Sequence, residues 1–206
     1  MNRLPRLSAV GLLAAGLLAF GYARTSAEPA ARRLADDKTP TERPDQQNAT
    51  PMTAIARIHG AGANKDKIKG TVTFVQRQEN VRVLIDVDGL TPGKHGIHIH
   101  EKTDLSDPDL KGAGGHWNPE GHKHGAPNEG MHHAGDLGNI TADAKGNAKT
   151  ELSISGVTVN GEKNGVVGHS IVIHEKEDDL KSDPAGNSGA RIAGGVIEAS
   201  GKKDSK

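Results

Sequence analysis

Apolar and polar residues alternate along most of the chain after residue 51. In AIARIHG (54–60), IKGTVTFVQ (68–76) and VRVLIDVDGL (81–90), every second residue is apolar or small. The polar stretches NKDK and RQEN separate these runs. A period of two interrupted by such stretches is typical of half-buried antiparallel strands joined by turns.

Five further short stretches continue the series: HGIHIHE (95–101), LGNITAD (137–143), KTELSISG (149–156), HSIVIHE (169–175) and RIAGGVIEA (191–199). None of the eight has the spacing of an amphipathic helix. The sequence therefore predicts one all-β domain over residues 52–200, built as a sandwich or barrel.

Two segments break this rhythm. They run from Glu101 to about Asp136 and from Glu175 to about Ala190, and both are rich in Gly, Asp, Pro and Asn. Connections of this length without regular structure are uncommon in compact domains and are usually functional or disordered. We expect function in both loops.

The ends of the chain have different compositions. Residues 1–27 contain Arg3 and Arg6, an apolar run and small residues, the pattern of a secretory signal peptide. Cleavage could follow Ala23 or Ala27, and an uncleaved segment would act as a membrane tether. Residues 28–51 are polar and dotted with proline, which predicts a disordered linker. Residues 201–206 form a polar tail.

The net charge and the cysteine content limit the possible partners of the protein and the ways in which its loops can be ordered. The 206 residues carry a formal net charge of zero and include no cysteine. Without a basic excess we expect no nucleic-acid partner. Export usually permits disulfides, so this chain must order its long loops by packing, hydrogen bonds or metal.

Histidines are concentrated where such ordering is needed. His98 and His100 are two residues apart in a strand and share one face, whereas Ile97 and Ile99 face the core. His174 closes another strand. The first loop adds Asp136 and five histidines, namely His116, His122, His124, His132 and His133.

Imidazole suits zinc and copper, and a carboxylate among imidazoles favours zinc. These side chains suffice for two metal sites. A weak scavenging loop without defined geometry is an alternative. Spacing alone does not choose between His122 and His124, or between His132 and His133.

The ordered motifs GIHIHE, GGHWNP, HKHGAP, HHAGDLGN, VIHEKEDD and GNSGARIAGGVIE resemble those of the copper-zinc superoxide dismutases over residues 52–199. The resemblance implies an eight-stranded antiparallel Greek-key barrel with two functional loops. It also implies copper and zinc as cofactors, and superoxide as substrate.

Matched motif by motif, the resemblance assigns the ligands. The copper ligands would be His98, His100, His116 and His174, and the zinc ligands would be His116, His124, His133 and Asp136. His116 would bridge both metals and carry a proton. Asp178 would link the ligands of the two metals through hydrogen bonds, and Arg191 would guide the anion to the site.

The chain also departs from the family. The two cysteines of the family disulfide are replaced by Leu110 and Gly194, which puts loop order and dimer geometry in question. The short second loop looks more like that of the bacterial exported members. A homodimer therefore remains an option.

We expect an exported enzyme, periplasmic or extracellular, that converts superoxide to oxygen and hydrogen peroxide in antioxidant defence. Two rival functions are a protein that sequesters copper or zinc and a structural module with vestigial sites. Arg191 argues against the first, because metal storage has no use for an anion guide. The full ligand set argues against the second.

Overall fold

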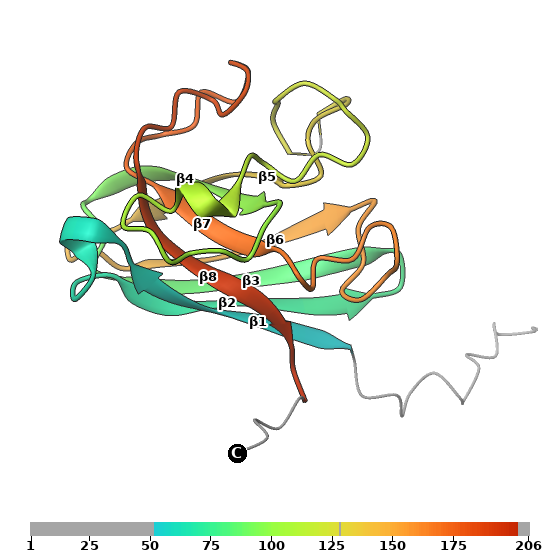
Figure 1. The fold of residues 1–206 in the computed structure, drawn as a ribbon, viewed down its shortest axis with the longest axis horizontal. Helices are drawn as coiled ribbons and strands as arrows, with labels where there is room; N and C mark the ends of the chain where they lie inside the picture. The colour runs from blue at the N-terminus through green and yellow to red at the C-terminus, as the bar shows by residue number, and fades with distance from the viewer. Residues whose placement is uncertain (1–51, 128, 202–206) are drawn as a thin grey trace, which may run out of the picture. The chain divides into compact units, whose positions relative to one another are not determined.

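The computed structural model describes residues 52–127 and 129–201, and these form an all-β domain (Figure 1). The predicted signal peptide, the linker and all but the first residue of the tail lie outside the described residues. The eight strands are β1 (Thr53–Gly60), β2 (Lys69–Arg77), β3 (Asn80–Asp88), β4 (Gly93–His100), β5 (Asp136–Ala142), β6 (Ala148–Ser155), β7 (Ser170–His174) and β8 (Arg191–Ala199).

The strands form one sheet in the order β5-β4-β7-β8-β1-β2-β3-β6, and every neighbouring pair is antiparallel. Because β5 and β6 are in contact, the connection β3–β4 passes over β6 and β5, and the connection β6–β7 passes over β5 and β4, which is Greek-key topology. The edge strands β5 and β6 contact each other and are joined by a tight turn. The sheet is therefore a nearly closed barrel, and the predicted fold class is confirmed.

The core consists of the alternate residues that the sequence pattern selects. Val81, Val83, Ile85 and Val87 of β3 are all buried, while the residues between them are at least partly exposed. β1 shows the same alternation. Burial of each such aliphatic side chain contributes about 1.5–3 kcal/mol.

β4 and β7 differ from the half-buried strands that the pattern predicts. Six consecutive residues from His95 to His100 are buried, and so is the whole of β7. Ile97 and Ile99 lie in the barrel core, whereas the opposite face of β4 is covered by the two long loops. That covered outer face is where the histidines lie.

Both predicted loops are present. The first, residues 101–135, contains one short 3-10 helix, η3 (Lys111–Ala113), and the second covers residues 175–190. A second 3-10 turn, η2 (Gly62–Asn64), follows β1. A further long connection that the sequence analysis did not single out, residues 156–169, buries Val157, Val159 and Val166. In the described part of the chain no helix has the length and apolarity to cross a membrane.

Candidate metal centre

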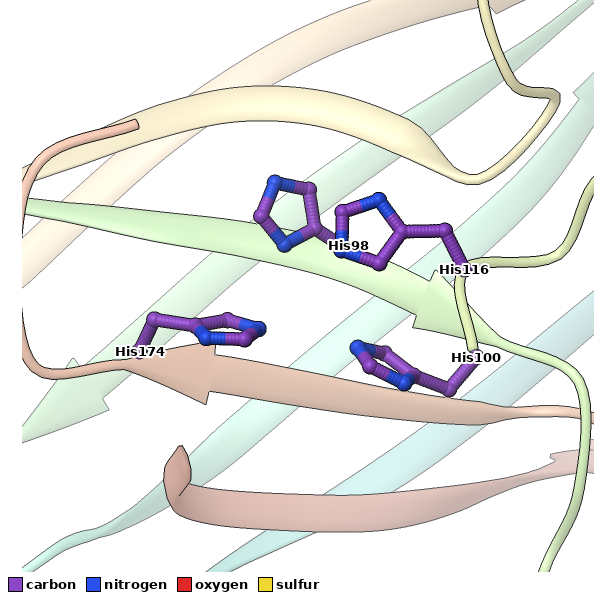
Figure 2. Close-up of side chains that lie close together, drawn as sticks. All are labelled: His98, His100, His116 and His174. Carbon is purple, nitrogen blue, oxygen red and sulfur yellow. The ribbon is translucent and has the colours of Figure 1, made fainter. Parts of the chain in front are cut away.

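Two neighbouring strands bring three histidines together. β4 carries His98 and His100 on its outer face, and β7 pairs with it so that His98 lies opposite Val172. The register between β7 and β8 shifts between Ile173 and His174. The extra residue, Ile192, lies on β8. His174 follows Val172 on the outer face of β7, where its ring lies near those of His98 and His100 (Figure 2).

A fourth histidine, His116, comes from the first loop. The loop returns to β4 at this point, where His116 forms an isolated bridge with His100 and Trp117 N donates to Ile99 O over 2.8 Å. The ring centroids of His116 and His98 are 3.9 Å apart, and those of His116 and His100 are 5.0 Å apart. Figure 2 shows the four rings around a common space.

Each of these four rings has one buried nitrogen without a hydrogen-bond partner. The four atoms are His98 Nδ1, His100 Nε2, His116 Nε2 and His174 Nε2. A buried polar atom without a partner is rare and costs about 1–3 kcal/mol. Four in one group have the chemistry of a nitrogen donor set, and ligand atoms of all four residues lie within 4.8 Å of one another. Four imidazoles fit copper.

The second nitrogen of each ring is tied to an acceptor. His98 Nε2 lies 2.8 Å from Asp178 Oδ2, and His116 Nδ1 lies 2.8 Å from Asp136 Oδ1. The Nδ1 atoms of His100 and His174 lie 3.1 and 3.2 Å from the carbonyl oxygens of Gly114 and Gly189. Because carboxylate and carbonyl oxygens only accept, these nitrogens donate, and the unpaired nitrogens keep their lone pairs.

Burial keeps three of these rings neutral. Loss of solvation lowers the pKa of His98 to about 4, of His100 to about 2 and of His174 to about 3. The charge of Arg191 also lowers the pKa of His100 and His174, whereas the hydrogen bond to Asp178 partly offsets the effect of burial on the pKa of His98. Neutral imidazole is the form that binds a metal ion, so the site does not have to release protons to bind at neutral pH.

A second group shares His116 with the first. Ligand atoms of His116, His124, His133 and Asp136 lie within 4.8 Å of one another. The Nδ1 atoms of the three rings lie 2.8, 3.0 and 3.2 Å from Asp136 Oδ1. Three imidazoles and one carboxylate around a common point fit tetrahedral zinc.

Hydrogen bonds hold the Asp136 carboxylate in place. Its Oδ2 accepts from the backbone N–H groups of Gly125 and His133 at 3.1 and 3.0 Å. Although burial opposes ionisation, hydrogen bonds from His116 and His124 keep its pKa far below the usual value. Asp136 is therefore ionised, as a zinc ligand must be.

Asp178 lies between the two groups. Its Oδ2 accepts from His98 Nε2, and its Oδ1 lies 2.9 Å from His124 Nε2. Burial opposes protonation of His124, yet its hydrogen bonds to Asp136 and Asp178 raise its pKa to about 10. One carboxylate thus orients a ring from each group, the contact that the resemblance implies.

Arg191 lies beside the first group, because it pairs with His174 across the strands and its Nη2 shares the Gly114 carbonyl with His100 Nδ1. It lines a cavity of about 480 Å³ with Asp109, Lys111, Gly189 and Ala190. Its Nη1 and Nη2 donate to Leu110 O and Gly114 O over 2.6 and 2.7 Å. The half-buried guanidinium is therefore held in a fixed position close to His100 and His174.

The positions of the two missing family cysteines are in contact. A Cβ built at Gly194 would lie 3.2 Å from Leu110 Cδ1. Leu110 is buried and packs with Ala61, Ala113 and Val172. An apolar contact thus stands where the resemblance places the disulfide.

The structure distinguishes the histidines between which spacing did not choose. His124 and His133 join the second group, whereas His122 and His132 lie outside it. His59 and His169 also lie outside both groups.

Sequence reasoning gave no role to His95, which is buried on the core side of β4. Its Nδ1 lies 2.8 Å from His174 O, and its Nε2 lies 2.8 Å from Thr91 O. His95 therefore fixes the backbone that carries His174. The sequence did contain a signal for this position. His95 is two residues before Ile97 in the strand, so its ring lies on the same, core-facing side of β4.

A Greek-key barrel with two adjoining groups of buried histidines, one of them containing an aspartate, defines a metalloprotein with two metal sites. The profile of the family Copper/zinc superoxide dismutase (SODC) matches residues 68–197. The chain belongs to the copper-zinc superoxide dismutase family. It is an enzyme that acts on superoxide, and its cofactors are copper and zinc.

Named relatives agree with this assignment. The chain is 40% identical over 161 residues to the extracellular copper-zinc superoxide dismutase of Drosophila melanogaster, covering 74% of this chain and 88% of the relative. It is 42% identical over 154 residues to the extracellular enzyme of Caenorhabditis elegans, covering 71% and 69%. The crystal structure of the clock protein EA4 superposes with a TM-score of 0.65 at 40% identity, covering 73% of this chain and 96% of the other.

Proposed function

We propose that His98, His100, His116 and His174 hold a redox-active copper, and that His116, His124, His133 and Asp136 hold zinc. The observation that carries this proposal is the set of four buried, unpaired ring nitrogens that face one another. A bound copper ion would supply the one-electron chemistry that oxidises one superoxide to oxygen and reduces a second to hydrogen peroxide.

The chain's own groups would supply attraction and protons. Arg191, held by two hydrogen bonds close to His100 and His174, would draw the superoxide anion toward the four rings by its charge. His116 has its Nδ1 toward Asp136 and its Nε2 toward the first group. If the ring gave up its Nδ1 proton on holding zinc, Nε2 would be the atom that takes up a proton and passes it to the reduced substrate. The reaction consumes two protons for each pair of superoxide ions.

Asp178 would act by positioning. Because its two oxygens accept from His98 and His124, a displacement of one ring is transmitted to the other. Groups that orient metal ligands in this way typically affect metal affinity 10- to 100-fold. The zinc group would serve mainly to keep His116 in place.

We also propose export, to the periplasm or the extracellular space, for antioxidant defence. The motif at residues 1–27 and the extracellular names of several relatives support this. Homodimer formation, a retained membrane tether and closer kinship to the bacterial exported members stay predictions.

Elemental analysis and the dismutation rate, measured on the same preparation, test the proposal. We expect one copper and one zinc per chain and a rate that falls in proportion to copper content. High copper content without turnover would instead favour the sequestering function.

A further inference from the structure

Two histidines of the first loop, His122 and His132, belong to neither group of the metal centre. Together with Glu120 and Asn164 they line a cavity of about 170 Å³ between this loop and the connection from β6 to β7. His122 and His132 are half-buried, and Glu120 is exposed at the rim. The cavity therefore opens to solvent and contains groups that bind metal ions.

Backbone carbonyls fix both rings in the form that binds metal. His122 Nδ1 lies 3.1 Å from His132 O, and His132 Nδ1 lies 2.8 Å from His133 O. Since a carbonyl only accepts, each Nδ1 donates and each neutral ring keeps its lone pair on Nε2. Histidine ligands commonly use their second nitrogen in this way.

The separation between His122 and Glu120 is that of two ligands of one ion. His122 Nε2 lies 3.7 Å from Glu120 Oε2, which is too long for a hydrogen bond. Two donors at about 2.1 Å from a tetrahedral zinc ion lie about 3.4 Å apart. A small shift of the exposed glutamate reaches that geometry.

Asn164 supplies an independent indication. Its Nδ2 donates to Gly156 O over 2.9 Å, while its Oδ1 is buried and has no hydrogen-bond partner. Buried polar atoms nearly always have a partner. Because less than 1 Å² of this oxygen is accessible, the Asn164 side chain has to turn toward the cavity before Oδ1 can accept from an ion-bound water.

We propose that this cavity is an auxiliary site for a zinc-type divalent ion. His122 Nε2 and the Glu120 carboxylate make the first contacts, His132 closes on the ion, and Asn164 Oδ1 accepts from a bound water. Among the described residues, every group of three or more donors within 4.8 Å of one another belongs to the buried centre, so His132 has to move toward His122 and Glu120 to complete the auxiliary site. The auxiliary site is therefore open, forms on binding, and binds more weakly than the buried centre.

Its position couples it to the zinc group. His132 donates to the carbonyl of His133, whose own ring and N–H both lie near Asp136. An ion held by His122 and His132 would restrain this part of the loop from outside. The site thus offers a surface binding point for zinc beside the buried group.

Titration of the fully metal-loaded full chain with Zn²⁺, followed by calorimetry, tests the proposal. We expect one further equivalent to bind after the buried centre is full. His122→Gln and His132→Gln should abolish this event, and Glu120→Gln should weaken it by about tenfold. His59→Gln, which removes another exposed histidine outside the cavity, should leave it unchanged.

The proposal is overturned if no further equivalent binds, if it persists when both His122 and His132 are replaced, or if His59→Gln abolishes it as well. Copper and zinc content of the buried centre is measured in every variant. Should His132→Gln disturb the adjacent zinc group, the result with His122→Gln and Glu120→Gln decides.

Discussion

The first loop has two halves that are held in different ways. In residues 101–115, Lys102 N donates to Ala113 O and Glu101 N to Gly115 O, while Leu110 and Ala113 are buried. The Asp107 carboxylate accepts from three backbone N–H groups. This half is ordered by ordinary packing and hydrogen bonds.

Residues 116–135 depend on polar groups instead. Trp117 anchors their start in the barrel core, but Met131 is 77% exposed. Beyond Trp117, the contacts centre on Asp136, which the rings of His116, His124 and His133 surround. This half encloses the proposed zinc position.

The comparison assigns the three expected sources of loop order, packing, hydrogen bonds and metal, to different halves of the loop. The family disulfide would join position 110, which lies in the first half, to position 194. In this chain the apolar cluster around Leu110 stands in its place. Arg191 adds two hydrogen bonds to the same half. Only the second half is left for zinc to stabilise.

The largest effect is expected from the strand ligands, which lie outside both halves. His98→Ala or His174→Ala should lower the dismutation rate by more than about a hundredfold, since even groups that merely orient a ligand contribute 10- to 100-fold. Zinc content should stay near one per chain. Equal loss of both metals would show that the ligands are not divided as proposed.

Metal removal should separate the two halves directly. Hydrogen exchange in residues 118–135 should accelerate by about a hundredfold or more, because a ligand at 100 times its Kd stabilises by about 2.7 kcal/mol. Residues 101–115 and the strands should keep their protection. Unchanged protection throughout the loop would mean that packing orders the second half too.

Leu110→Ala tests the packing of the first half. Truncating a buried leucine should lower the free energy of unfolding by about 3 kcal/mol, measured by denaturant titration of metal-loaded protein. Met131→Ala is the matched control from the exposed second half and should change it by less than about 0.5 kcal/mol. A similar decrease in the free energy of unfolding of both variants would contradict the proposed difference between the two halves of the loop.

Arg191 carries a positive charge and also donates two hydrogen bonds to backbone carbonyls in the first half of the loop. Arg191→Ala should slow the reaction by about tenfold and flatten its dependence on ionic strength, because salt screens long-range attraction. Arg191→Lys should keep the salt dependence but lose the two-pronged contact with Leu110 O and Gly114 O. A salt dependence that survives in Arg191→Ala would assign the steering to other charges.

The smallest effect concerns reducing agents. With no cysteine in the chain, dithiothreitol should change neither the melting temperature nor the initial rate beyond measurement error. A shift would have to come from metal reduction or chelation, and a parallel measurement with tris(hydroxypropyl)phosphine identifies that cause.

The pattern of apolar residues determined the eight strands of this protein and their inward faces. β3 illustrates this, because Val81 to Val87 alternate in sequence as they do in burial. Local alternation predicts a strand but says little about what covers its outer side. The burial of both faces of β4 from His95 to His100 therefore could not be predicted, since it depends on loops that fold back from later in the chain.

The motifs also determined which residues are candidates for the metal centre, and the resemblance selected His124 over His122 and His133 over His132. Their spacing could not, because adjacent or near-adjacent histidines have the same chemistry. Only the tertiary structure decided which rings point toward Asp136 and Asp178, because backbone hydrogen bonds and loop packing set the direction of each side chain. The same packing placed Leu110 over Gly194, a contact between residues 84 positions apart in the sequence.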